Sequence, residues 1–420
     1  MQRIWAIALA VGLSSLLSVV AWLVTPIVFV HPSLQIRGAI AMAQSTITPS
    51  QALDRLFTRP DLQADWFASS FLQQVPLPQI QAILRSITTD LGAYRQIEPT
   101  AEANRFMVLF EQGSLQAQIS LNASGQIATL LLQPNALTLE EAIAQLQALP
   151  GTTSLLVLKD GVKQAAINAD EPLAVGSAFK LAVLRALQQQ IEQGDRTWAE
   201  TVQLDPTWKS LPSGILQSWP EGASLTLETL ATLMISLSDN TATDALIQIL
   251  GREAVEAYGL RNVPFLTTRE LFVLKAPENA QQLQQYRDGD GDTRRSLLSQ
   301  LQTLPLPPVE TFLGEPIALD VEWFFSTREL CSLIESVAAL PLMGVNPGIA
   351  NPADWNRIAY KGGSESGVIN LTSHLQAADG TTYCIAATWN NPDAPLSDMT
   401  LIGLYQGLIS GLKTAPAANP

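Results

Sequence analysis

The chain has 420 residues, of which 47% are hydrophobic and 15% charged, and its formal net charge is −14. That length allows two or three domains and at least one large core. A strongly acidic chain is a poor match for a polyphosphate backbone, so nucleic acid is excluded as a partner. The two histidines, His31 and His374, are too few for a histidine-rich metal site, and we expect neither a metal nor a cofactor.

The first 43 residues have the pattern of an export signal. Arg3 precedes an uncharged run from Ile4 to Val30, and small residues follow at Ala41 and Ala43. This order is typical of a signal peptide, but an apolar run of about 20 residues or more also suffices to span a bilayer. We therefore expect an exported protein that is periplasmic, secreted or membrane-anchored. An uncleaved segment 1–43 would be its only contact with a membrane.

Residues 46–135 predict a small α+β domain. Helical periodicity is followed by three alternating stretches with Gly-containing turns between them. The helical segments are 50–58 and 78–94, and the alternating stretches are 105–112, 114–122 and 126–134. Because this domain contains no cluster of titratable residues, we interpret it as a scaffold or docking module.

Residues 137–413 predict a larger α+β domain. An amphipathic helix over 137–150 precedes two strands joined by Asp160-Gly161, a strong hairpin signal. A long helical region from Ser177 to about residue 340 comes next. Three strands (357–362, 367–378 and 382–391) and a helix over 398–413 complete the domain. Strands at both ends of the domain predict one antiparallel sheet with helices on its faces. We expect residues 414–420 to be a disordered tail.

Two further features concern cysteines and acidic residues. Cys331 and Cys384 lie in a predicted helix and a predicted strand, and we expect two buried free thiols, although an exported protein could bridge them. The segment 288–295 (DGDGDTRR) starts like a calcium loop, but Thr293 and a later serine replace the required Gly and Glu. We interpret it as a solvated turn in which Asp292 caps the next helix.

The stretch AVGSAFKLAVL places Lys180 among apolar residues, three positions after Ser177. Residues three apart on a helix share a face, so the hydroxyl and the amine could come within hydrogen-bonding reach. Apolar surroundings favour the neutral form of a lysine, which can then act as a general base for a serine nucleophile. Ser177 would also lie near a helix N-terminus, where backbone N–H groups favour a developing oxyanion. A capping serine and a lysine that reaches solvent fit the same pattern.

Two other motifs favour the catalytic interpretation. Ser238, Asp239 and Asn240 follow an apolar helical run, a position that also suits a helix cap. Lys361 ends a predicted strand and is followed by Gly362 and Gly363, which either admit a ligand close to the backbone or mark a bulge.

In this order, S-x-x-K, S-D-N and K-[T/G]-G resemble the three motifs of the serine β-lactamases and penicillin-binding proteins. The order of strands and helices is also similar to the class A β-lactamase fold, over about residues 140–413. The resemblance implies a β-lactamase-like α+β fold, with an antiparallel sheet flanked by helices and an all-helical subdomain. The N-terminal module further resembles exported serine hydrolases related to a clavulanate-biosynthesis protein, for which strong β-lactamase activity is not implied.

The resemblance also implies a role for each motif residue. Ser177 would be the acylating nucleophile and Lys180 its base, and Ser238 would relay a proton to the leaving group. Asn240 would bind the substrate amide, and Lys361 would attract a substrate carboxylate and tune Ser238. The backbone N–H groups of Ser177 and Ser364 match the oxyanion hole, beside Gly363, which we include among the substrate-binding residues.

Two departures from the family pattern affect these expectations. Gly362 stands where the family usually has Thr or Ser, so a carboxylate-binding hydroxyl is lost unless Ser364 supplies one. The class A deacylating Glu, in an E-x-x-L-N context, has no clear match. Glu270 is the nearest acid, and we favour an ion pair with a nearby Arg over a catalytic role for it.

The sequence therefore predicts a serine hydrolase of the β-lactamase or D-Ala-D-Ala carboxypeptidase type that works through an acyl-enzyme. Its substrate would be a small molecule or a peptidoglycan-derived amide or ester: a β-lactam, a D-alanyl peptide or a small ester. The alternative is a penicillin-binding or cell-wall-associated protein with slow or no turnover.

Overall fold

The structure, a computed structural model, describes residues 47–111 and 113–414. The predicted export segment, 1–43, and all but the first residue of the predicted tail lie outside the described residues. The chain divides into two compact units, each described below by itself. The described parts of these units are 139–398 for the larger one, and 47–138 with 399–414 for the smaller one.

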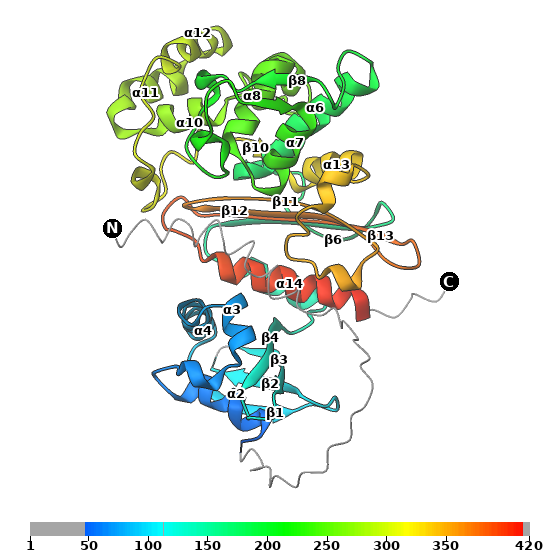
Figure 1. Cartoon of the computed structure of the whole chain (residues 1–420). Helices are drawn as coiled ribbons and strands as arrows, with labels where there is room; N and C mark the ends of the chain where they lie inside the picture. The colour runs from blue at the N-terminus through cyan, green and yellow to red at the C-terminus, as the bar shows by residue number, and fades with distance from the viewer. Residues whose placement is uncertain (1–46, 112, 415–420) are drawn as a thin grey trace, which may run out of the picture. The chain divides into compact units, whose positions relative to one another are not determined.

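The smaller unit contains a four-stranded antiparallel sheet in the order β1-β2-β3-β4. The three predicted strands are present. The strand β1 was not predicted, because most of its residues are exposed and its apolar residues do not alternate with polar ones. The core of the unit includes Leu53, Phe71, Ile119 and Ile127. Its elements are α2 (Pro49–Thr58), η1 (Ala64–Trp66), α3 (Ser69–Gln74), α4 (Leu77–Leu91), β1 (Tyr94–Pro99), β2 (Arg105–Phe110), β3 (Ser114–Leu121) and β4 (Ile127–Pro134) (Figure 1).

The C-terminal helix α14 (Asp398–Thr414) groups with this smaller unit from residue 399 onward. The sequence analysis assigned the helix to the larger domain. Its glycines allow the close approach, because a Cβ on Gly407 would lie 2.7 Å from the Asn135 carbonyl oxygen, and one on Gly411 would overlap the backbone of Leu137. The Leu137 N–H donates to the Gly407 carbonyl at 2.8 Å.

The larger unit is built on a five-stranded antiparallel sheet in the order β11-β12-β13-β5-β6. Strands from both ends of the domain meet where β13 pairs with β5, which confirms the predicted α+β architecture. The hairpin turn also forms as predicted, since Asp160 and Gly161 both have positive φ angles, 47° and 75°. The strands are β5 (Thr152–Lys159), β6 (Val162–Ile167), β11 (Arg357–Glu365), β12 (Val368–Gln376) and β13 (Thr382–Asn390).

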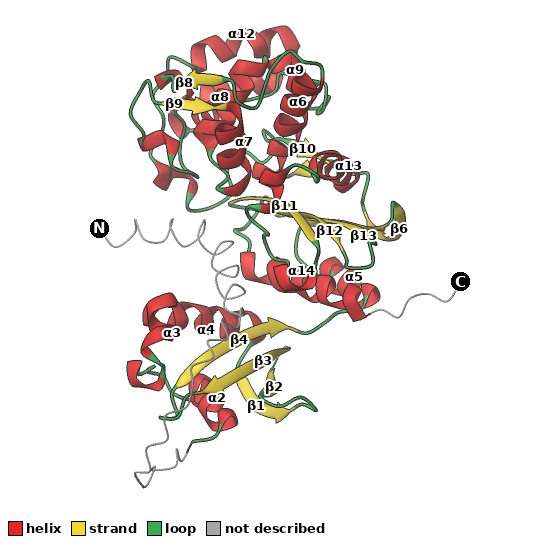
Figure 2. Cartoon of the chain, turned by 45° about the vertical axis from the view of Figure 1, so that its right-hand side comes forward, coloured by secondary structure: helices red, strands yellow, loops and turns green. Residues whose placement is uncertain are grey.

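Helices pack on both faces of this sheet (Figure 2). The helix α13 (Thr327–Val337) contacts β5, β12 and β13, and α5 (Leu139–Gln147) contacts β5 and β6 on the other face. A mostly helical region lies beyond α13, and its core includes almost the whole apolar surface of α6. The helices of that region are α6 (Lys180–Glu192), α7 (Leu227–Ser236), α8 (Asn240–Leu250), α9 (Arg252–Glu256), α10 (Thr268–Lys275), α11 (Ala280–Asp288) and α12 (Gly291–Leu301).

Short elements complete the larger unit. Two small ladders pair β7 with β10 and β8 with β9. These strands are β7 (Leu173–Ala174), β8 (Thr201–Gln203), β9 (Ser224–Thr226) and β10 (Phe324–Phe325). The 3₁₀ turns are η2 (Gly176–Phe179), η3 (Pro206–Trp208), η4 (Leu216–Ser218), η5 (Pro277–Asn279), η6 (Val309–Phe312), η7 (Pro341–Gly344) and η8 (Pro352–Asp354).

Cys331 and Cys384 form a disulfide, so the expectation of two free thiols is wrong. Cys331 lies on α13 and Cys384 on β13, and their Cα atoms are 5.8 Å apart. Burial in a helix and a strand suited free thiols equally well, and only the packing of α13 on the sheet brings the two together. The bond links the helical cover of the sheet to one of its inner strands.

Three smaller findings bear on the remaining expectations. Asp290, not Asp292, caps α12 by accepting the Thr293 N–H at 2.9 Å, because the helix begins two residues earlier than expected. Across residues 47–111 and 113–414, no helix combines the length and apolar character needed to cross a bilayer. The same residues contain no group of three or more His, Cys, Asp or Glu side chains suited to a metal ion.

Candidate active site

Ser177 and Lys180 lie on one continuous helical segment, because the 3₁₀ turn η2 runs directly into α6. Phe179 between them has helical φ and ψ angles of −55° and −23°. Its ring stacks on Trp323, with centroids 3.8 Å apart, and this packing fixes the turn in an apolar wall. The predicted spacing of hydroxyl and amine on one face of a helical turn is therefore present.

The Lys180 amine is fully buried and donates three hydrogen bonds. Its Nζ lies 2.6 Å from the Ser238 carbonyl oxygen, 3.1 Å from Ser238 Oγ and 2.7 Å from Asn240 Oδ1. Burial lowers the pKa of Lys180 to about 7, although the charges of Asp239 and Asp244 oppose that shift. Ser177 Oγ is not among its partners in the described part of the chain, so Ser238 and Asn240 hold the base beside the nucleophile.

Ser238 connects two lysines. Its Oγ lies 3.1 Å from Lys180 Nζ and 3.1 Å from Lys361 Nζ. Lys361 is 3% exposed, and both its burial and the neighbouring Lys180 charge hold its pKa well below the usual value. Ser238 also has a positive φ of 55°, which is uncommon for a residue with a side chain and is often found at functional sites. The Ser238 hydroxyl lies between two amines whose pKa values are lowered, so either amine can be neutral near pH 7. This arrangement suits the transfer of a proton through the hydroxyl.

Asp239 and Asn240 fix the loop that borders the site. Asp239 is fully buried, caps α8 through the Ala242 N–H and accepts the N–H groups of Ile215 and Leu216. The predicted cap is therefore right for Asp239. Asn240 accepts from Lys180 and donates from Nδ2 to the Leu211 carbonyl at 2.9 Å, which leaves one amide hydrogen for a substrate oxygen.

The N-terminal part of η2 and the end of β11 touch through two glycines. A Cβ on Gly363 would overlap the Ser177 nitrogen and lie 2.6 Å from the Ala178 nitrogen. A Cβ on Gly176, whose φ is +48°, would lie 3.1 Å from the Ser364 nitrogen. Both residues must therefore lack a side chain for the Ser177 and Ser364 amides to come together. This close approach of the two segments is consistent with the predicted oxyanion hole.

Gly362, the departure from the usual third motif, has a local cause. A Cβ on Gly362 would overlap the Tyr360 hydroxyl and lie 3.1 Å from the Asn370 carbonyl oxygen. Tyr360 is 6% exposed, and burial raises the pKa of its hydroxyl above the usual value. A tyrosine two residues earlier thus fills the space where the family usually places a Thr or Ser side chain.

Glu270 pairs with Arg252 through two contacts of 2.8 and 3.0 Å and caps α10 with Thr267. It is 1% exposed, and the ion pair that the sequence analysis favoured is what the structure contains. His374 lies on β12 and does not line the cavity described below.

Asp244 is a buried acid that sequence reasoning missed. It accepts the Thr268 N–H at 2.7 Å, the Thr268 hydroxyl at 2.9 Å and the Arg269 N–H at 2.9 Å. Burial raises its pKa to about 7 against the effect of these hydrogen bonds. Its position four residues after Asn240 on α8, facing the same side, is the signal that could have found it.

A cavity of about 360 Å³ opens at Ser177. Ser177, Asn240 and Ser364 line it, whereas the buried Lys180 and Lys361 and the partly exposed Ser238 do not. Among the described residues its acidic lining consists of Glu365 and Asp398, and none of those lining residues is a Lys, Arg or His. The rest of the wall is mainly apolar and includes Phe179, Leu271, Phe272, Phe312 and Trp323. The sequence analysis identified neither the two acids nor the aromatic wall, because these residues come from distant segments.

Comparison with known proteins agrees with this geometry. Residues 138–284 match the profile of the family described as the beta-lactamase enzyme family. This confirms the predicted resemblance over that segment, which contains Ser177, Lys180, Ser238 and Asn240 but ends before Lys361. The search of curated proteins finds no match.

Several solved structures are also similar to part of this chain. A β-lactamase from Sphaerobacter thermophilus is 21% identical, with 66% of this chain and 95% of that chain covered and a TM-score of 0.46. PBP-A is 17% identical, with 67% and 97% covered and a TM-score of 0.45. A mutant of PBP-A, solved as its acyl-enzyme complex with penicillin-G, is 17% identical, with 67% and 98% covered and a TM-score of 0.44.

Proposed function

We propose that this chain is a serine hydrolase that forms an acyl-enzyme on Ser177, and that it acylates faster than it deacylates. The observation that carries the proposal is the pair of buried lysines joined through the Ser238 hydroxyl. A structural lysine in this place would need a carboxylate as a direct partner, whereas Lys180 has three neutral oxygen acceptors. Such an amine can exist in the neutral form that a general base requires.

Acylation follows from these positions. Ser177 Oγ attacks the substrate carbonyl carbon, and its proton passes to the neutral Lys180 amine. The carbonyl oxygen becomes an oxyanion that accepts hydrogen bonds from the Ser177 and Ser364 amides. As the C–N or C–O bond breaks, the leaving group takes a proton from Ser238 Oγ, which is resupplied by a lysine. The products are the Ser177 ester and a neutral amine or alcohol.

Deacylation needs a water molecule and a base for its proton. Glu270 is held by Arg252 and does not line the cavity. The two acids that do line it are Glu365, whose partner is Lys275, and Asp398. Lys180 can still accept the proton of the attacking water after acylation, but a single base shared between both steps supports slow turnover.

Incubation with a chromogenic cephalosporin, a fluorescent penicillin and a chromogenic ester, followed by intact mass measurement, tests the proposal. We expect a mass increase of one acyl group per chain that persists for minutes and is absent in Ser177→Ala. Asp393→Asn, an exposed change outside the cavity, is the matched control and should be acylated as the unchanged protein is. The absence of both adduct and turnover with all three compounds would refute the serine hydrolase assignment.

Rapid turnover of the cephalosporin is the second candidate outcome, that of a true β-lactamase. It is favoured by the family match over residues 138–284. The PBP-A mutant complex with penicillin-G supports β-lactams as test compounds. If the protein hydrolyses the cephalosporin faster than its penicillin adduct decays, the protein is a true β-lactamase.

We also propose that the protein acts outside the cytoplasm. The charge and hydropathy pattern of residues 1–43 supports export. The Cys331–Cys384 disulfide is further support, because such bonds persist in oxidising compartments. Fractionation of cells that express the full chain, with detection by the acylating probe, tests this proposal.

A further inference from the structure

The chemical character of the cavity points to a substrate class. We propose that the preferred substrates are apolar or aromatic esters or amides that carry a protonated amine, and not the carboxylate-bearing compounds typical of β-lactam recognition. This inference rests on the proposed function, since it concerns the compounds that acylate Ser177.

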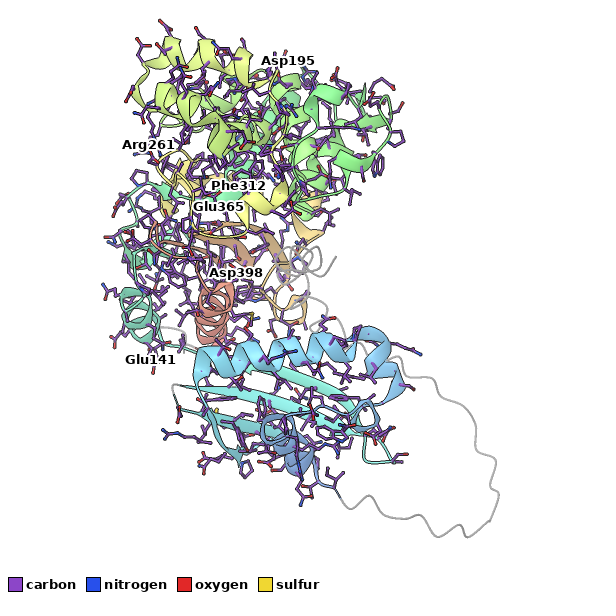
Figure 3. The ribbon with its side chains drawn as sticks, turned by 90° about the vertical axis from the view of Figure 1, so that its left-hand side faces the viewer. Glu141, Asp195, Arg261, Phe312, Glu365 and Asp398 are labelled. Carbon is purple, nitrogen blue, oxygen red and sulfur yellow. A yellow bond between two sulfur atoms is a disulfide. The ribbon has the colours of Figure 1, made fainter. Side chains whose placement is uncertain are left out.

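The charge of the cavity wall favours a cationic group on the substrate. Asp398 lines the cavity, and no cation pairs with it within the described residues. Burial raises the pKa of Asp398 above its usual value, and a cation bound beside it would return that pKa toward normal. Figure 3 labels Asp398 and Glu365, which reach the cavity from the start of α14 and the end of β11.

Glu365 adds a second acceptor at the same wall. Its Oε1 accepts from Lys275 Nζ at 2.9 Å, but its side chain keeps 20% of its surface exposed, whereas that of Lys275 keeps 1%. A ligand in the cavity therefore meets the carboxylate and not the ammonium group. A substrate carboxylate would face Asp398 and the exposed part of Glu365, and among the described residues that line the cavity it would meet no Lys, Arg or His.

The groups that would usually bind a substrate carboxylate do not reach the cavity. The side chain of Lys361 does not line the cavity, and its amine is used by Ser238 and the Gly362 carbonyl. Gly362 supplies no hydroxyl, and the Tyr360 hydroxyl that fills its place does not line the cavity either. Within the described lining of the cavity, a substrate carboxylate therefore finds no positively charged side chain, and residue 362 offers it no hydroxyl.

The aromatic wall of the cavity favours the same class of substrate. Phe272 and Phe312 pack at 5.1 Å between ring centroids, and Phe179 and Trp323 stack at 3.8 Å. All four line the cavity (Phe312 is labelled in Figure 3). Aromatic faces next to carboxylates attract ammonium groups through cation–π interactions and accommodate an apolar body. The formal net charge of −14 acts in the same direction by attracting cations to the molecule.

Three matched esters test the inference. They are p-nitrophenyl esters of phenylpropanoic acid that carry an aminomethyl, a hydroxymethyl or a carboxylate group at the para position of the phenyl ring. At pH 8 the first is a cation, the second is neutral and the third is an anion. We expect second-order acylation rates to fall about fivefold or more from each to the next, in that order, which corresponds to one charge contact near a protein surface.

Variants show whether the two acids cause this order. Asp398→Asn and Glu365→Gln should each lower the ratio of the aminomethyl rate to the hydroxymethyl rate by about twofold or more, since the two acids share the effect. Asp393→Asn should keep the ratio unchanged, since Asp393 is an exposed acid five positions before Asp398 in the sequence and does not line the cavity. Circular dichroism melts identify a variant that fails to fold, in which case the other acid still provides the test.

The two proposals fail in different ways. If the neutral ester does not label Ser177 at all, the proposed hydrolase function is wrong. If the neutral ester labels Ser177 but the carboxylate ester reacts as fast as the aminomethyl ester or faster, the hydrolase function stands and the substrate inference is wrong.

Discussion

Lys180 has no exposed surface, yet each of its three hydrogen bonds goes to a neutral oxygen. Its nearest acids, Asp239 and Asp244, act on it through space without a direct contact, and the lowered pKa of about 7 reflects that balance. An amine that ionises near neutral pH can both take and return a proton in one catalytic cycle. Burial thus suits this residue to the proposed role of general base, for which an exposed lysine would be too fully protonated.

The pKa of Lys180 predicts the pH dependence of acylation. Because the base must be neutral, the second-order acylation rate should rise about tenfold per pH unit below pH ~7 and level off above it. Lys180→Arg keeps the charge at every pH and should lower the rate by at least about a hundredfold. Stopped-flow measurements with the neutral ester between pH 5 and 9 check this, and a rate that falls as the pH rises through 7 would exclude Lys180 as the base.

Gly363 offers a test of the oxyanion geometry. A Cβ there overlaps the Ser177 nitrogen, so Gly363→Ala should separate the two amides and lower the acylation rate by about a hundredfold or more. Gly291→Ala is the control, because a Cβ on Gly291 meets nothing within 4 Å. If Gly363→Ala acylates at the normal rate, the Ser177 and Ser364 amides do not form the oxyanion hole.

The sequence predicted which catalytic candidates converge, but not the side chains that surround them. The order of the three motifs predicted that Lys180, Ser238 and Lys361 converge, and both amines lie 3.1 Å from Ser238 Oγ. Asp244, Tyr360 and the cavity acids escaped prediction, since their roles depend on neighbours from distant segments.

Two connections between elements fix the larger unit around the site. The disulfide joins α13 to β13, and a buried ion cluster joins α10 to the end of β11. In that cluster Lys275 contacts Glu322 and Glu365. Burial alone would lower the pKa of Lys275, but the two carboxylates raise it above its usual value. Burial, together with Glu365, raises the pKa of Glu322.

The disulfide should contribute substantially to stability. It closes a loop whose ends are 53 residues apart. Restricting an unfolded loop of that length stabilises the fold by about 4 kcal/mol in the chain-entropy account. We expect the double variant Cys331→Ala/Cys384→Ala to lose about that much free energy of unfolding in urea titrations. Dithiothreitol should destabilise the unchanged protein and leave the variant unaffected, and equal stability of both proteins would contradict the structural role.

Removing the cation of the buried cluster should be costly. Lys275→Met leaves two carboxylates without their partner and should lower the free energy of unfolding by about 3–5 kcal/mol. Adding Glu322→Gln should recover part of the loss, because one of the unpaired acids is then neutral. Lys163→Met on the exposed strand β6 is the control, and its urea midpoint should match that of the unchanged protein. If Lys275→Met has the same free energy of unfolding as the protein without the substitution, the lysine and its two carboxylates are not all charged in the folded protein.

Element prediction succeeded where periodicity was strong and failed where long-range packing decides. The hairpin turn at Asp160-Gly161 and the strands of the five-stranded sheet follow from local pattern. The strand β1 is mostly exposed and therefore lacked the apolar alternation that marked its neighbours. The disulfide needed the packing of α13 on β13, which no local pattern contains.

For the molecule as a whole, the sheet of the larger unit brings the beginning and end of that domain together. The pairing of β13 with β5 requires strands that are more than 200 residues apart in sequence to fold as one layer. The second and third motifs reach the first only through this layer and the helices that contact it. The order of helices and strands alone predicted it, since one antiparallel sheet is the simplest arrangement that buries both strand groups.

Pre-steady-state kinetics are the sharpest test of the proposal that Ser177 is acylated faster than its acyl-enzyme is hydrolysed. Mixing the full chain with an excess of the neutral p-nitrophenyl ester should release a burst of about one nitrophenolate per chain, followed by a slower linear phase. Ser177→Ala should show neither phase above the buffer rate. A linear release from the first turnover, or a burst that persists in Ser177→Ala, would contradict the account.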